Sequence, residues 1–125
     1  MEIRDSDFEE MVLRSDRPVL VHFWASWSQS SRMMQLIVDR LAVTVDDWAD
    51  VYIVNVDRSP ALVNQFEVCD VPTFIVFFGG KTIDRRAGAM TEEQMILLLG
   101  AGEFRMPESH FTDIDDNEGL AEQAA

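Results

Sequence analysis

The chain has 125 residues, of which 47% are hydrophobic, and its 23 acidic and 10 basic residues give a formal net charge of −13. This length suits one domain with a hydrophobic core, and the negative charge argues against a nucleic-acid surface because phosphates would be repelled. Residues 1–7 are charged and contain no long apolar run, so we expect neither a secretory signal nor a membrane span.

The first predicted helix covers residues 7–14. Ser6 and Glu9 have the spacing of a capping box, in which side chains three residues apart satisfy each other's backbone N–H groups. Residues 1–4 are a candidate for a short edge strand. Residues 19–24 are β-branched or aromatic and almost wholly apolar, which predicts a strand buried on both faces.

A long helix is expected after the polar segment 25–31, because apolar residues then recur at helical spacing. The residues at this spacing are Met33, Met34, Leu36, Ile37, Leu41 and Val45. We expect Met33 and Met34 to lie in the core or at its rim.

Two further apolar strands are predicted over residues 51–56 and 73–78. Between them, Ser59-Pro60 reads as an N-cap followed by proline at the first helical position, so a short helix should run to about Phe66.

Gly79-Gly80 signals a tight turn into a more polar hairpin partner over residues 81–87, which is expected at the sheet edge. Residues 91–94 form a second capping box and open a helix that Gly100 should end near Leu99. This order of helices and strands predicts an α/β fold with a largely parallel sheet and one antiparallel hairpin.

The C-terminal part has no hydrophobic period. Residues 100–125 carry seven acids and one base, so their net charge is −6. We therefore predict a domain over residues 1–100 and an acidic, flexible tail over residues 101–125. Its scattered apolar residues, such as Phe111 and Ile114, suggest the further hypothesis that the tail folds back onto its own domain.

Five local segments of residues 1–99 resemble the thioredoxin family. The resemblance implies a central mixed sheet with helices on both faces and a cis bond between Val71 and Pro72. The segments are the strand-to-helix junction (residues 24–32), a strand (54–57), the cis-proline segment (71–74), the hairpin (77–81) and a glycine segment (87–89).

By this resemblance, Ser28 and Ser31 occupy the positions of the family's two redox cysteines. A serine hydroxyl does not ionise near neutral pH and cannot form a disulfide. The resemblance also places His22 and Ile53 where the family buries a carboxylate paired with a lysine. We therefore predict that the chain does not catalyse dithiol–disulfide exchange, is not an enzyme and uses no cofactor.

The resemblance leaves a recognition groove of Trp27, Val71, Pro72, Gly88 and Ala89. In the family such a groove binds extended peptides, partly through backbone hydrogen bonds. The main functional hypothesis is thus a redox-inactive interaction module: an adaptor, a peptide binder or an assembly subunit with a protein partner, acting in the cytoplasm or the nucleus.

Cys69 is the single cysteine, so no intramolecular disulfide can form and nothing indicates an oxidising compartment. It lies two residues before Val71 and should border the groove. One alternative function is therefore a monothiol redox protein, with a weak covalent dimer through Cys69. The other is a thioredoxin-type disulfide oxidoreductase whose native cysteines were replaced by Ser28 and Ser31.

The remaining polar residues of interest are those at the start of the long helix and His22. Ser28 and Ser31, with Arg32, could bind an anion at a helix N-terminus, but an ordinary N-cap is the preferred interpretation. His22 should be neutral and hydrogen-bonded within its strand. With no Cys/His cluster in the sequence, no metal site is predicted.

Overall fold

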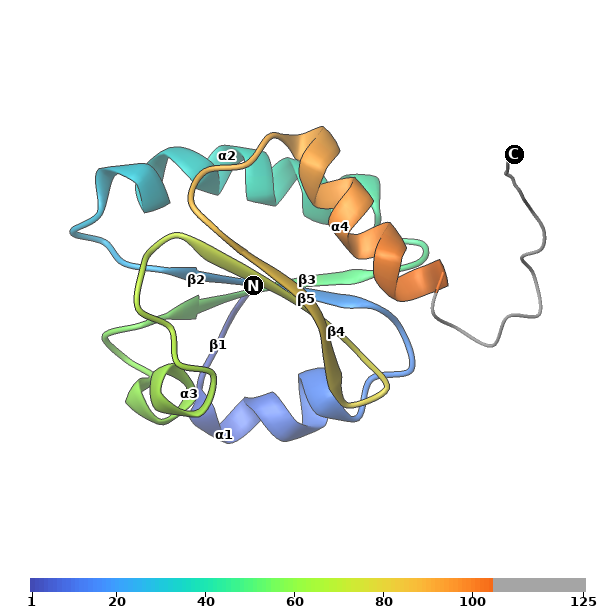
Figure 1. Cartoon of the computed structure of the whole chain (residues 1–125), viewed down its shortest axis with the longest axis horizontal. Coiled ribbons are helices and arrows are strands. Elements are labelled where there is room, and N and C mark those ends of the chain that lie inside the picture. The colour runs from blue at the N-terminus through green and yellow to red at the C-terminus, as the bar shows by residue number, and fades with distance from the viewer. Residues whose placement is uncertain (105–125) are drawn as a thin grey trace.

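Five strands form one mixed sheet in the order β1-β3-β2-β4-β5 in the computed structural model, which describes residues 1–104 (Figure 1). Strands β1, β3 and β2 are parallel, while β4 runs antiparallel to β2 and β5 antiparallel to β4. The strands are β1 (Glu2–Ile3), β2 (Val19–Trp24), β3 (Asp50–Asn55), β4 (Thr73–Phe78) and β5 (Lys81–Ala87).

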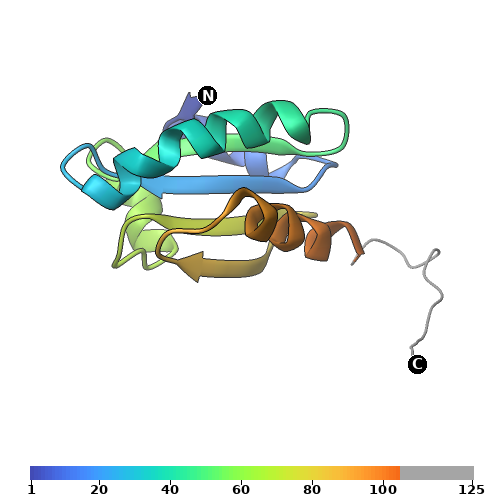
Figure 2. The same cartoon turned by 90° about the horizontal axis from the view of Figure 1, so that it is seen from above.

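Helices cover both faces of the sheet, and the cis bond between Val71 and Pro72 is present. This is the thioredoxin fold expected from the sequence, including the short edge strand at the N-terminus. Figure 2 shows α2 and α4 running over the same face. The helical elements are α1 (Asp5–Phe8), η1 (Glu9–Leu13), α2 (Gln29–Thr44), α3 (Pro60–Gln65) and α4 (Glu92–Phe104). No described helix is long and apolar enough to span a bilayer.

Strand β2 is the centre of the fold because its alternate residues enter two separate cores. Leu20 packs in the core beneath α2 and α4. Val21 and Phe23 pack in the core on the opposite face, which α1, η1 and α3 cover. The predicted burial of this strand on both faces is confirmed.

The first helical segment begins two residues earlier than predicted. The backbone N–H of Arg4 donates to the Asp7 carboxylate at 3.0 Å, so the Ser6–Glu9 capping box is wrong. The pairing of β1 with β3 ends at Ile3 and leaves only Arg4 to make the turn. The segment then continues as π-helix η1, in which the N–H of Arg14 donates to the Glu9 carbonyl at 3.0 Å.

Helix α3 receives its cap from a distant part of the chain. Ser59 stands at the N-cap position as predicted, but its side chain makes no capping bond and is fully buried. Instead, the Asp5 carboxylate accepts the N–H of Leu62 at 3.2 Å. This tertiary hydrogen bond thus joins α1 to α3.

Two expectations for the other helices are wrong. Met33 is 68% exposed, although it was predicted to lie in the core or at its rim, whereas Met34 is buried as predicted. Helix α4 continues past Gly100 to Phe104, because a glycine inside a helix costs only about 1 kcal/mol and Leu99 lies fully buried just before it. The capping box of α4 is confirmed by Thr91 and Gln94, whose reciprocal bonds measure 2.9 and 3.1 Å.

The segment 105–125, which holds most of the predicted acidic tail, lies outside the described residues. The hypothesis that Phe111 and Ile114 fold back onto the domain therefore stays a prediction.

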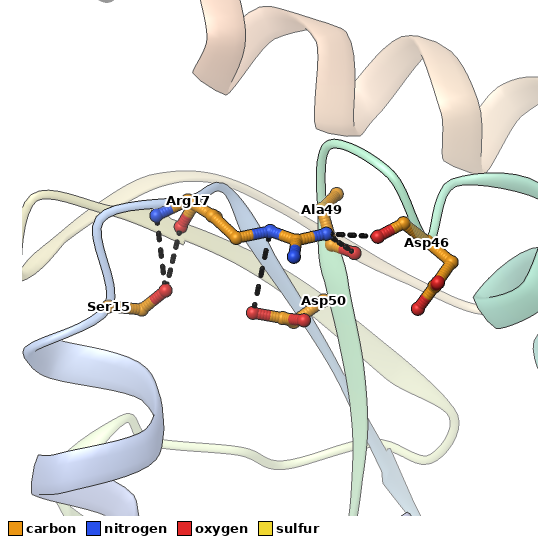
Figure 3. Close-up of polar contacts among 5 residues, drawn as sticks. All are labelled: Ser15, Arg17, Asp46, Ala49 and Asp50. Carbon is orange, nitrogen blue, oxygen red and sulfur yellow. Dashed lines mark hydrogen bonds and ion pairs between the residues drawn. The ribbon is translucent and has the colours of Figure 1, made fainter.

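Arg17, just before β2, is hydrogen-bonded to the turn between α2 and β3 (Figure 3). Its guanidinium donates to the carbonyl of Asp46 and, at 2.8 Å, to that of Ala49. It also lies 3.9 Å from the Asp50 carboxylate, and the Ser15 hydroxyl accepts the Arg17 backbone N–H at 3.1 Å. One side chain thus satisfies carbonyl groups that follow the end of α2.

Candidate functional site

The predicted site residues lie on loops that meet at one end of the sheet. The strand register pairs Trp24 with Asn55, and it aligns Phe23 with Thr73 and Ala87, so these ends of β2, β3, β4 and β5 lie side by side. The loops that follow β2, β3 and β5 and the loop that precedes β4 therefore leave the sheet together. Ligand sites of open α/β sheets commonly form at the carboxyl ends of their parallel strands.

Ser28 and Ser31 occupy the first turn of α2. Ser28 is the N-cap residue, and its hydroxyl accepts the backbone N–H of Ser31 at 3.2 Å. Ser28 is half-buried, whereas Ser31 is fully buried and its hydroxyl has no partner among the described residues. This supports the simple N-cap interpretation of Ser28.

The exposed residues beside Ser28 are held by hydrogen bonds that the sequence did not reveal. The Trp27 indole, 66% exposed, donates to the Asp57 carboxylate at 3.0 Å. The Arg32 guanidinium donates to the Ser26 carbonyl at 2.7 Å, so it turns back onto the loop. The sequence analysis placed Asp57 only in a strand-like segment. It can accept the Trp27 indole N–H because the chain turns after β3.

His22 and Ile53 are direct partners across β2 and β3, and both are buried. Burial lowers the pKa of His22 from 6.5 to about 4, so the ring is neutral at physiological pH. The predicted hydrogen bond is wrong, because neither ring nitrogen has a partner among the described residues. The ring instead stacks on Phe74, with centroids 4.7 Å apart and an interplanar angle of 10°.

The structure joins the two glycine- and proline-containing segments of the predicted groove. The N–H of Gly88 donates to the Pro72 carbonyl at 2.8 Å, and Gly88 has a φ of +96°, which favours glycine. Pro72 is buried, Val71 is half-buried and Ala89 is exposed. Exposed Ala89 and Trp27 are therefore the accessible apolar members of this groove.

An apolar hollow that the sequence did not predict has Ala89 in its lining. It forms between α2 and the start of α4 and has a volume of about 380 Å³. It could not be read from helical spacing, which placed Met33 in the core or at its rim. Its lining residues are Ser30, Met33, Met34, Ile37, Ala89, Met90, Thr91 and Gln94.

Cys69 is an exposed free thiol on the loop that leads to Pro72. Its Sγ lies 3.7 Å from the Glu67 carbonyl, two residues earlier, and Glu67 has a φ of +52°. The loop thus presents the thiol to solvent. Among residues 1–104, no group of three or more His, Cys, Asp or Glu side chains is placed to hold a metal ion.

Residues 1–100 match the family model described as Thioredoxin. The chain is 41% identical over 93 residues to "Thioredoxin M4, chloroplastic" of Arabidopsis thaliana, covering 74% of this chain and 48% of that protein. It is 38% identical over 89 residues to "Thioredoxin 1" of Nostoc sp., covering 71% and 83% of the two chains. It is 35% identical to "Thioredoxin" of Alicyclobacillus acidocaldarius, covering 76% and 90%. The chain spans about half the length of the chloroplast relative.

These relatives overturn one prediction. Ser28, Ser31, His22 and Ile53 suggested that the chain is not an enzyme, but its relatives are named thioredoxins, which are oxidoreductases. The prediction was wrong because it weighed four side chains against the whole of a matching domain. The relatives lend no support to a redox-inactive interaction module and favour a thioredoxin-type redox protein.

Proposed function

Because this chain belongs to the thioredoxin family, we propose that it is a thioredoxin-type redox protein whose thiol chemistry proceeds through Cys69. The observation that carries the proposal is the position of that thiol. It is exposed, and it lies three residues before the cis-proline whose carbonyl holds Gly88. The sequence offers no other sulfur nucleophile of this kind.

The reaction is thiol–disulfide exchange with a cysteine-containing protein segment. The Cys69 thiolate attacks one sulfur of the partner's disulfide, the S–S bond breaks, and the partner's second sulfur leaves as a thiolate. A low-molecular-weight thiol then attacks the mixed disulfide at the Cys69 sulfur and releases the partner as a thiol. A second such thiol restores Cys69, so the partner is reduced by two electrons while two small thiols become one disulfide.

The groove supplies the recognition part of the proposal. Trp27 and Ala89 are exposed apolar contacts, while Val71 and Gly88 flank them with backbone suited to an extended segment. Recognition by backbone would let the protein bind partners that differ in sequence.

The test compares wild type with Cys69→Ser in the reduction of a low-molecular-weight disulfide and of insulin by excess glutathione. We expect a rate above the uncatalysed one that Cys69→Ser abolishes. Trp27→Ala should lower the insulin rate while the small disulfide reacts at the unaltered rate. A wild-type rate equal to background, or one that survives Cys69→Ser, would overturn this route.

A second candidate is favoured by the geometry at α2. The N–H of Ser31 points at the Ser28 hydroxyl, and a thiolate at position 28 would receive the same bond together with the field of a 16-residue helix. Cysteines at positions 28 and 31 would therefore make a dithiol oxidoreductase.

The variant Ser28→Cys/Ser31→Cys tests this candidate in the insulin assay. A dithiothreitol-dependent rate well above that of wild type is expected. A double variant that folds, forms the 28–31 disulfide and still fails to reduce insulin would contradict it.

A further inference from the structure

We propose that the hollow between α2 and α4 is a specificity pocket for protein substrates, taking a large apolar side chain from a positively charged segment. This inference rests on the proposed function, because Ala89 belongs both to the groove and to the hollow, and Ser30 lies in the first turn of α2 beside the site. A peptide segment that contacts Trp27 and Ala89 could thus place its next side chain in the hollow, because Ala89 lines it.

The lining of the hollow determines what kind of side chain it accepts. Its volume of about 380 Å³ is open at the surface, and Met33, Met34, Ile37 and Met90 supply most of its walls. Methionine side chains are flexible and polarizable, so they adapt to apolar groups of different shape. Met33 is 68% exposed at the rim and can fold over a guest, whereas Met34 and Met90 are nearly buried and form the floor.

The negative charge of the protein favours a positively charged segment as the carrier of this side chain. Of the two basic residues of α2, Arg40 pairs with Glu92 at 3.1 Å, whereas Arg32 keeps its charge and donates to the neutral Ser26 carbonyl of the loop before the helix. Glu93 stays exposed next to Gln94 at the rim, and the whole chain carries a net charge of −13. A negatively charged protein attracts basic segments and accelerates their association.

The same charge argues against two other occupants. Residues 105–125 contain six acids and one base, so their net charge of −5 is repelled by a domain that is itself negative. A second copy brings another net charge of −13. A basic partner is the occupant that the electrostatics favour.

The experiment measures binding of fluorescein-labelled 12-residue peptides to the full chain by anisotropy. Each peptide carries four lysines, serine in place of cysteine so that no covalent bond forms, and either leucine or alanine at one central position. We expect wild type to bind the leucine peptide about tenfold more tightly than the alanine peptide, the size expected for burying one such side chain. Replacing the four lysines of the leucine peptide by glutamate should weaken its binding to wild type.

Two matched variants locate the effect. Met33→Gln changes an exposed rim residue and should reduce the leucine-to-alanine ratio to about threefold or less. Val43→Gln makes a similar change at a residue 78% exposed on the same helix but outside the hollow, and should leave the ratio unaltered. A wild-type ratio of one, or an equal loss in both variants, overturns the proposal.

The remaining outcomes identify other occupants or separate this proposal from the proposed function. Tighter peptide binding by Phe111→Ser/Ile114→Ser, or a concentration-dependent dimer that Met33→Gln dissolves, would assign the hollow to the tail or to a second copy and overturn it. If wild type binds the leucine and alanine peptides equally but still reduces disulfides through Cys69, the pocket proposal is refuted and the proposed function stands. If wild type prefers the leucine peptide but shows no Cys69-dependent reduction, the thiol route is refuted and the pocket proposal stands.

Discussion

The two ends of β2 differ in how fully their buried polar groups are paired. At the amino end, Arg17 satisfies two carbonyls of the α2–β3 turn, the Ser15 hydroxyl accepts the Arg17 backbone N–H, and only the Arg17 Nε, 3.9 Å from the Asp50 carboxylate, has no hydrogen-bond partner among the described residues. At the carboxyl end, the side chains of His22, Trp24 and Ser31 keep buried polar atoms that have no partner among the described residues. Buried polar groups are normally paired, so unpaired ones cost stability and concentrate where a fold is used rather than merely held together.

This contrast separates a structural end from the end at which the proposed site lies. The loops that meet at the carboxyl end also carry the exposed Trp27, the free thiol of Cys69 and the Gly88–Pro72 bond. Substitutions at the two ends should therefore have different effects on stability. Those at the structural end remove hydrogen bonds and lower the free energy of unfolding, whereas those at the other end remove unpaired polar groups or alter recognition.

The largest expected effect concerns the pH dependence of stability. The pKa of His22 is about 4 in the folded chain and about 6.5 when unfolded, so the unfolded state binds a proton at higher pH. Folding stability from this group is present above pH 6.5 and is lost as the pH falls to about 4, by about 3 kcal/mol in all. Urea unfolding of wild type and His22→Leu at several pH values measures the difference.

His110→Ala is the control for this prediction, since it removes the second histidine and should keep the wild-type slope between pH 6.5 and 4. An identical slope in wild type and His22→Leu would show that the ring is not held neutral by burial.

Breaking the structural end should cost about 2 kcal/mol. Arg17→Met keeps the aliphatic stem but leaves the Asp46 and Ala49 carbonyls without their donor. Arg14→Met is the control, because Arg14 makes an exposed pair with Glu9 at 3.5 Å that should contribute less than about 0.5 kcal/mol. Equal free energies of unfolding for the two variants would contradict the role of Arg17.

The first turn of α2 gives a sharper contrast within one site. Ser28→Ala removes an N-cap bond and should lower the free energy of unfolding by about 1 kcal/mol. Ser31→Ala removes a buried hydroxyl that has no partner, so stability should stay constant or rise slightly. Thermal unfolding compares the two, and a larger loss for Ser31→Ala would mean that its hydroxyl is bonded.

The smallest expected effect compares two caps of α3. Asp5→Ala removes the carboxylate that accepts the Leu62 N–H and should cost about 0.5–1 kcal/mol. Ser59→Ala removes the side chain that makes no capping bond and should not destabilise the protein. The order is tested by urea unfolding, and it is refuted if Ser59→Ala proves the more harmful change.

Much of the fold could be predicted because local chemistry determined it. The apolar run over residues 19–24, the Gly79-Gly80 turn and the Thr91–Gln94 capping box each depend on residues that are adjacent or three apart. The cis-proline segment and the glycine segment marked the family and hence the end of the sheet where the site lies. The prediction that the chain is not an enzyme, made from Ser28, Ser31, His22 and Ile53, failed because a few positions were weighed against a similarity that extends over the whole domain.

The sequence by itself determined the order of strands and helices and the burial of the strand that carries His22, since each follows from hydrophobic period, capping spacing or family motif. Only the tertiary structure decided that Asp5 rather than Ser59 caps α3, that Asp57 holds Trp27, and that Met33 borders a hollow instead of filling the core. Helical spacing marks an apolar side chain without saying which neighbour will cover it. A carboxylate finds its N–H partner 57 residues away only once the sheet has brought α1 and α3 onto the same face.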